Sequence, residues 1–135
     1  MPERHERGLV DTSVVIDLDE LDPGSLPVEI AISAVTLAEL AVGPHATDDP
    51  EERARRQDRL QRAEVEFDPL PVDREVARAY ARVYSAVAAA GRGPRGHRAF
   101  DLLIAATALA EGLPLYTRNA KDVADLEGLV DVVAV

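Results

Sequence analysis

Short apolar runs alternate with longer stretches in which apolar residues recur every three to four positions. The short runs predict strands over residues 8–11, 28–33, 113–116 and 129–135, and a short strand or extended link over residues 67–72. The longer stretches predict helices from residue 12 or 13, and over residues 33–43, 48–64, 73–90 and 101–110. This alternation predicts an α/β fold, with a mostly parallel central sheet of about five strands and helices on both faces.

One of these helices carries an unexpected acid. An apolar face recurs over residues 102–110, Gly112 ends the helix, and Pro114 follows two residues later. Asp101 opens this otherwise buried helix. A carboxylate in that place can cap the helix, because a helix N-terminus favours negative charge. It can also be an acid held at the mouth of a cleft, and both interpretations stay open at this point.

Composition limits the class of protein. A chain of 135 residues with 47% apolar and 30% charged residues is sufficient for one domain, which we assign to residues 1–135. The first eight residues are charged, and no apolar run approaches the ~20 residues that span a bilayer. Without cysteine there is no disulfide or thiolate chemistry, so we expect a cytoplasmic protein without membrane contact.

The net charge of −10 disfavours binding of nucleic acid by a simple basic surface. It does not exclude a nuclease whose acids hold divalent cations, since a bound cation inverts the local charge.

Two further acids occupy unusual places. Asp11 ends the first predicted strand, where α/β sheets place their sites, although a turn or helix cap explains it equally well. Glu39 lies among apolar residues in the second helix. With Thr36 it has the spacing of a capping box, but if Ser33 caps the helix instead, Glu39 is free for other work.

Two other helical surfaces leave alternatives open. The helix over residues 48–64 has acids first and arginines after, with i,i+4 pairs such as Glu51 with Arg55. We interpret it as a solvated face, with a basic strip for RNA or a partner as the alternative. Val76, Tyr80 and Tyr84 share one side of the next helix, which is either core or a dimer interface.

Four acids stand out by context: Asp11, Glu39, Asp101 and Asp122. They are far apart in the sequence, so only a fold that gathers strand ends can bring them together. Clusters of carboxylate oxygens suit Mg²⁺ or Mn²⁺, which support phosphoryl chemistry.

The segments VDTSVVID, SAVTLAELAVG, FDLLIAATALAEGLPLYTRN and NAKDVADL follow one another in this order. In them the chain resembles the PIN-domain ribonucleases, and in particular the VapC-like toxins of VapBC-type toxin–antitoxin pairs. The resemblance covers nearly the whole chain and implies a PIN-like fold. It also implies that Asp11, Glu39 and Asp101 bind metal. The fourth acid varies in the family, so either Asp122 or Asn119, the latter through water, completes the site.

The resemblance implies a Mg²⁺-dependent endoribonuclease in which Mn²⁺ can substitute. Water activated by one or two ions attacks the phosphate and leaves a 3′-hydroxyl. Thr12, Ser33 and Thr117 match positions that support the acids by hydrogen bonds. The implied partners are a small VapB-like antitoxin, which places a basic side chain in the acidic pocket, and a second copy in a homodimer or hetero-oligomer. Residues 91–98 predict a flexible basic loop that leads to Asp101 and suits phosphate binding, or only a Gly/Pro connector. From their positions alone, we expect four arginines to contact RNA phosphates: Arg92, Arg95, Arg98 and Arg118.

Three alternatives compete with this hypothesis. A receiver domain needs paired acids near the first strand, but Thr12 follows Asp11. A haloacid-dehalogenase-type phosphatase needs an acid two residues after its nucleophile, where Ser13 stands. A catalytically inactive PIN scaffold that only binds RNA or protein would lose the acids, and at least three are present.

Overall fold

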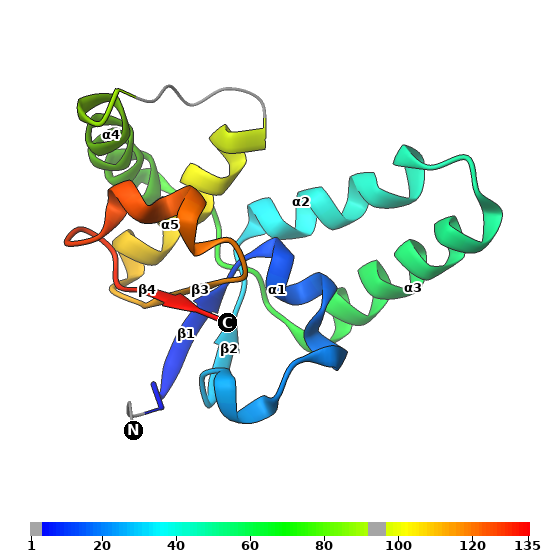
Figure 1. Cartoon of the computed structure of the whole chain (residues 1–135). Helices are drawn as coiled ribbons and strands as arrows, with labels where there is room; N and C mark the ends of the chain where they lie inside the picture. The colour runs from blue at the N-terminus through cyan, green and yellow to red at the C-terminus, as the bar shows by residue number, and fades with distance from the viewer. Residues whose placement is uncertain (1–3, 92–96) are drawn as a thin grey trace.

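The structure, a computed structural model, describes residues 4–91 and 97–135 (Figure 1). Four parallel strands form the sheet in the order β2-β1-β3-β4. They are β1 (Arg7–Val10), β2 (Glu29–Ala31), β3 (Leu115–Thr117) and β4 (Val132–Ala134). The predicted α/β fold with a parallel sheet is therefore confirmed.

The predicted fifth strand is wrong in detail. In residues 67–72 only Leu70 pairs with the sheet: its N–H donates to the Ile32 carbonyl at 2.9 Å, and its carbonyl accepts from the Ala34 N–H at 2.8 Å. Pro69 and Pro71 flank it and have no N–H to donate. The segment is therefore an extended link with a single bridge.

Helices fill the intervals between the strands. They are α1 (Thr12–Ile16), α2 (Ala34–Val42), α3 (Pro50–Glu66), α4 (Arg74–Ala89) and α5 (His97–Glu111). Short 3₁₀ turns, η1 (Leu18–Glu20), η2 (Pro23–Ser25), η3 (Gly43–Ala46) and η4 (Ala120–Leu126), complete the chain. The predicted turn or short helix near Asp122 is η4, and the closing strand is shorter than the sequence predicts.

Each face of the sheet has its own core. Leu9 and Leu115 point to the face covered by α4, α5 and η4. Their neighbours Val10 and Tyr116 point to the other face, where α1 and single residues of α2 and α3 pack. Successive side chains of a strand alternate between faces, so strands buried on both sides need continuous apolar sequence, as residues 8–10 have.

The side of α4 that could be core or interface divides into two parts. Val76 and Val83 are fully buried in the core that α4 shares with α5. Tyr80 is half-buried and Tyr84 is 47% exposed, with their ring centroids 6.4 Å apart. The valines therefore belong to the core, and the tyrosines flank it.

The end of α5 follows the sequence closely. Gly112 has a φ of +66°, its N–H donates to the Leu109 carbonyl, and the Leu113 N–H donates to the Ala108 carbonyl. This is a Schellman cap, which glycine favours because a side chain disfavours positive φ. The cap turns the chain directly into β3, so α5 and β3 are fixed relative to each other.

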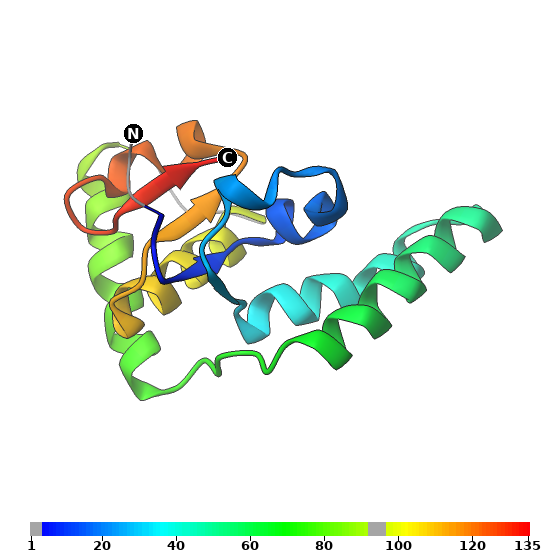
Figure 2. The same ribbon diagram turned by 90° about the horizontal axis from the view of Figure 1, so that it is seen from below.

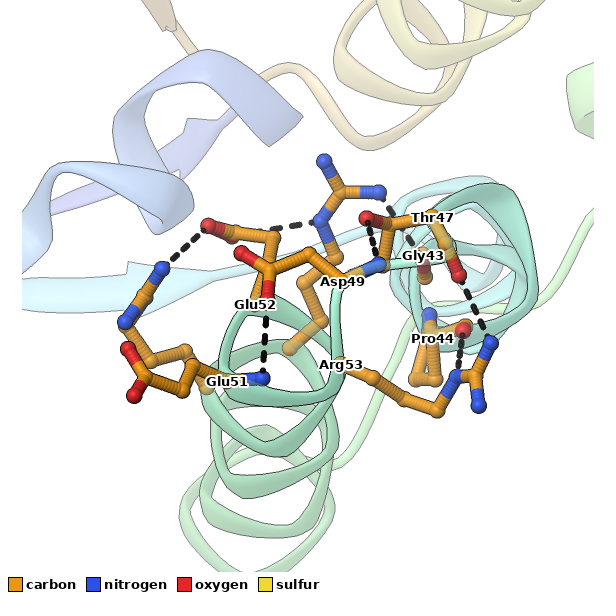
Figure 3. A network of polar contacts seen from close by, with 9 residues as sticks. Gly43, Pro44, Thr47, Asp49, Glu51, Glu52 and Arg53 are labelled. Atoms are coloured by element: carbon orange, nitrogen blue, oxygen red, sulfur yellow. Dashed lines mark hydrogen bonds and ion pairs between the residues drawn. The ribbon is translucent and has the colours of Figure 1, made fainter.

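Helices α2 and α3 run side by side and project away from the sheet as a hairpin (Figure 2). At its tip, Arg53 donates to the carbonyls of Pro44 and Thr47, and Arg56 donates to the carbonyl of Gly43 (Figure 3). Carbonyls at a helix end lack partners within the helix, and these guanidinium groups satisfy them. The tip is therefore stabilised by its own hydrogen bonds.

A first prediction concerns packing at Gly8. A Cβ added there would lie 2.5 Å from Cε1 of Tyr116, whose ring is buried. We expect Gly8→Ala to lower the free energy of unfolding by about 1–3 kcal/mol, because the ring cannot move away freely. Urea unfolding measures the change. Gly43→Ala is the control, since its Cβ has ordinary contacts and the site is helical; an equal loss in both variants would contradict the account.

In the part of the chain that the structure describes, no helix combines the length and apolar character needed to cross a membrane.

Candidate metal-binding active site

The carboxyl ends of the two central strands, β1 and β3, form the candidate site. Asp11 follows β1 directly, and its N–H donates to the Tyr116 carbonyl of β3 at 3.0 Å. Its Oδ1 accepts from the Val14 N–H at 3.2 Å, which caps α1. The two interpretations of Asp11 are thus compatible: it caps a helix and stands at the sheet edge.

Asp101 lies inside α5, not at its start. The helix begins at His97, so Asp101 is its fifth residue and cannot be the cap. The capping interpretation is therefore wrong, because the helix extends one turn further back than the apolar pattern indicates. Asp101 is exposed, while Leu102 behind it is buried. The helix holds this carboxylate at the sheet edge with its apolar face in the core.

Glu39 is free of capping work. Ser33 caps α2, since its Oγ accepts from the Val35 N–H at 3.0 Å. The Thr12 hydroxyl donates to Oε1 of Glu39 at 2.7 Å and lies 3.0 Å from the Thr36 hydroxyl. A hydroxyl carries one proton, so Thr36 donates to Thr12. This chain of contacts joins α2 to α1 and fixes Glu39 beside Asp11.

The loop after β3 brings the remaining candidates. Asp122 lies in η4 and is exposed, and its N–H donates to the Asn119 carbonyl at 2.9 Å. Asn119 is also exposed, and its N–H donates to Oγ1 of Thr117 at 3.0 Å. Thr117 thus shapes the loop through the backbone, as Ser33 shapes the start of α2. Among the hydrogen bonds of the described residues, Thr12 is the one predicted supporting residue that bonds an acid.

The charges of the other three acids act on Asp101. Partial burial, and then the negative charges of Glu39, Asp11 and Asp122, raise the pKa of Asp101 from 3.8 to about 6, while Arg98 lowers it. Because Asp101 is exposed to solvent, we give the three neighbouring charges more weight than burial. Carboxylates from four separate elements therefore share one field, and a cation would relieve their repulsion.

A small polar cavity of about 40 Å³ lies beside Asp11, Asp101 and Asp122, with room for about one water; Glu39 is not among the described residues that line it. Asp11, Ser13, Asp101, Asn119 and Asp122 are among the residues that line it. Among the described residues no three acids converge as a ready-made ion cage. Asp101 and Asp122 are exposed, and all the donors are oxygens, so the set fits Mg²⁺ by chemistry.

Ser13 is a supporting residue that the sequence analysis missed. Its hydroxyl donates to Oδ1 of Asp11 at 2.5 Å and accepts from the Arg118 N–H at 3.2 Å. It thereby joins the loop after β3 to Asp11. The position directly after the Asp11-Thr12 pair was the available signal, but a serine at a helix start is common for other reasons.

A second prediction follows for Ser13→Ala. The change removes the hydroxyl that orients Asp11 and leaves the Arg118 N–H without this partner. We expect about tenfold weaker Mg²⁺ binding, as for other outer-shell contacts, and a loss of about 1 kcal/mol in the free energy of unfolding. Titration calorimetry and urea unfolding measure both. Ser25→Ala, which removes a hydroxyl bonded to the Asp22 carbonyl, is the control and should leave metal affinity unchanged.

The four predicted phosphate contacts have different outcomes. Arg92 and Arg95 lie outside the described residues. Arg118 is partly exposed and pairs with Asp17 at 2.9 Å. Arg98, which is helical instead of part of a loop, has a side chain only 18% exposed. It lacks the open position that a phosphate-binding arginine needs.

The arginines of α3 are mostly engaged within the protein. Arg55 and Arg56 pair with Glu52 at 2.9 and 3.3 Å, instead of the predicted Glu51 pair, because Glu52 reaches both from one turn away. Arg62 contacts Asp19 at 3.2 Å beside a cavity of about 260 Å³. That cavity mixes both signs of charge and holds none of the four acids. The solvated interpretation of α3 therefore fits better than a basic RNA-binding strip.

Comparison with known proteins agrees with this geometry. Residues 8–128 match the model of the PIN domain family. Ribonuclease VapC5 of Mycobacterium tuberculosis is 38% identical over 128 residues, which are 93% of this chain and 91% of that protein. Ribonuclease VapC4 of the same organism is 38% identical over 117 residues, which are 84% of this chain and 86% of that protein.

Solved structures show the same relationship. The crystal structure of VapBC-5 from Mycobacterium tuberculosis, a member of the VapBC family of toxin–antitoxin systems, aligns with a TM-score of 0.84 at 38% identity, covering 96% of this chain and 99% of that chain. FitAcB from Neisseria gonorrhoeae aligns with a TM-score of 0.67 at 28% identity, covering 92% and 94%. The chain therefore belongs to the PIN-domain family, as a VapC-like member.

Proposed function

We propose that the protein is a Mg²⁺-dependent endoribonuclease, the toxin of a type II toxin–antitoxin pair. One observation carries the proposal: Asp11, Glu39, Asp101 and Asp122 come from four separate elements and share one electrostatic environment at the carboxyl edge of the sheet. Such an assembly is costly without a counter-ion, because like charges in one place repel. A bound divalent cation would offset this repulsion between the carboxylates.

Asp11, Glu39 and Asp101 would hold the ion, with Asp122 completing the set. Bound there, Mg²⁺ or Mn²⁺ would supply an activated water and neutralise charge on the phosphate. The chain provides the positions: Ser13 orients Asp11, Thr12 orients Glu39, and the buried face of α5 holds Asp101. Arg118 at the rim would contact an RNA phosphate after leaving Asp17.

Partners follow from the relatives. VapC5 and VapC4 are named ribonucleases, and VapBC-5 is a toxin–antitoxin complex. We propose that this chain likewise cleaves RNA in the cytoplasm and is inhibited by a VapB-like antitoxin. An antitoxin that inserts a basic side chain would meet the four acids directly, and the net charge of −10 favours such a partner. A homodimer is part of the same proposal.

The experiment is direct. Purified protein is incubated with single-stranded RNA and Mg²⁺, and the products are mapped at both ends. We expect internal cleavage that leaves a 3′-hydroxyl and is blocked by the antitoxin. Absence of cleavage in both Mg²⁺ and Mn²⁺ would overturn the proposal and favour the inactive binding scaffold.

A third prediction separates the two candidates for the fourth ligand. Both Asp122 and Asn119 line the cavity. Asp122 carries a negative charge close enough to raise the pKa of Asp101, whereas Asn119 is neutral. We therefore expect Asp122→Asn to weaken Mg²⁺ binding about tenfold or more and Asn119→Ala to change it less than threefold. Titration calorimetry of the two variants measures this, and the reverse order would assign the position to Asn119.

A further inference from the structure

A partly buried ion pair lies next to the site. Nη2 of Arg98 lies 3.6 Å from Oδ2 of Asp125, and each side chain is 18% exposed. Within the described residues, Nε and Nη2 of Arg98 are buried and have no hydrogen-bond partner. Burying two guanidinium nitrogens without hydrogen bonds is costly, so their position needs an explanation beyond stability.

The pair joins the two elements that carry exposed acids of the site. Arg98 precedes Asp101 by three residues, one turn earlier on α5. Asp125 follows Asp122 by three residues on η4. The backbone of η4 is not helical at Val123, which lies between these two acids, so helical hydrogen bonds alone do not fix where Asp122 stands.

We propose that Arg98 is a positioning residue: its ion pair with Asp125 fixes η4 against α5 and so sets the spacing of Asp101 and Asp122. This inference rests on the proposed function, because that spacing matters only if the acids share an ion. It replaces the role of Arg98 as an RNA contact, since Nε and Nη2 are buried and the side chain is only 18% exposed. Arg98 also lies close enough to lower the pKa of Asp101.

The direction in which cation affinity changes when Arg98 is replaced tests the proposal. Removing a positive charge beside a cation site should by electrostatics alone tighten cation binding. Removing a residue that holds the ligands in place should weaken it, typically by about 10–100-fold for outer-shell contacts. Arg98→Met removes the charge and keeps much of the side-chain length, so the two accounts predict opposite changes.

The experiment titrates Mn²⁺ into metal-free protein and follows the free ion by electron paramagnetic resonance. Four proteins are compared: wild type, Arg98→Met, Asp125→Asn and the double variant. We expect about tenfold weaker binding in each single variant, although they change the charge in opposite directions. The double variant should bind Mn²⁺ only a little more weakly than the weaker of the two single variants, because both changes break the same ion pair. Arg78→Met, which removes an exposed pair with Glu75 on α4, should bind normally.

The outcomes separate the possibilities. Unchanged or tighter Mn²⁺ binding by Arg98→Met overturns the inference, and a raised KM for RNA with normal Mn²⁺ binding would make Arg98 a phosphate contact instead. Absence of Mn²⁺ binding by the wild type would contradict the proposed function itself. Circular dichroism and Tm monitor folding; if Arg98→Met does not fold, Arg98→Lys should bind Mn²⁺ more weakly than wild type, and wild-type affinity would overturn the inference.

Discussion

Asp101→Asn is expected to abolish RNA cleavage while stabilising the metal-free protein. The loss of rate should exceed the about 10–100-fold typical of outer-shell changes, because the side chain would itself hold the ion. Asparagine keeps the size of the aspartate and removes its negative charge. The measurement is the cleavage rate of single-stranded RNA at saturating Mg²⁺, compared with Asp58→Asn, an exposed helix acid on α3. Wild-type activity in Asp101→Asn would remove this residue from the site.

The stability effect follows from the pKa of Asp101. Its value in the folded protein, about 6, lies above the ordinary 3.8, so the folded state binds the proton more tightly than the unfolded state. This contribution to stability is complete below pH 3.8 and is lost as the pH rises through 6. Because the side chain is exposed, we discount it to about 1 kcal/mol. At pH 7.5 in EDTA, Asp101→Asn should therefore unfold at higher urea than wild type, and a lower midpoint would contradict the account.

Removal of divalent metal is expected to lower the rate of RNA cleavage about as much as Asp101→Asn does. The acids cannot neutralise a phosphate without a cation. Cleavage should fall on the order of 10³-fold or more in EDTA, as for other losses of transition-state charge stabilisation. Mg²⁺ or Mn²⁺ should restore it. Circular dichroism in EDTA is the control for folding.

A different result would be informative. Cleavage that persists in EDTA after dialysis, with Asp101→Asn equally active, would show that the products come from another nuclease or another site. Loss of folding in EDTA would instead make the ion structural.

Local sequence patterns pointed to part of the candidate site. Asp11 was located because an apolar run ends immediately before it, and parallel strands end at one edge. Glu39 was recognised because an acid among apolar residues needs a reason, although only the structure shows that Ser33 takes the cap. The Gly112 stop followed from glycine's tolerance of positive φ.

The remaining features depend on contacts between distant residues. Residues 67–72 have the composition of a strand. Only the fold shows that a single residue of the segment, Leu70, pairs with the sheet, opposite Ser33. Arg98 was assigned to a flexible loop because glycines precede it, but α5 begins one residue earlier and carries its side chain inward. Ser13 bonds both Asp11 and the N–H of Arg118, which lies 105 residues further along the chain, and no local pattern can indicate that contact.

The central claim is that carboxylates from four elements form one divalent-metal site. Titration calorimetry of Mg²⁺ into metal-free protein tests it most directly, with wild type, Asp11→Asn, Glu39→Gln and Asp101→Asn measured under the same conditions. The account predicts saturable binding to the wild type and at least about tenfold weaker binding in each variant. No Mg²⁺ binding by folded wild type, or equal binding by all four proteins, would contradict it.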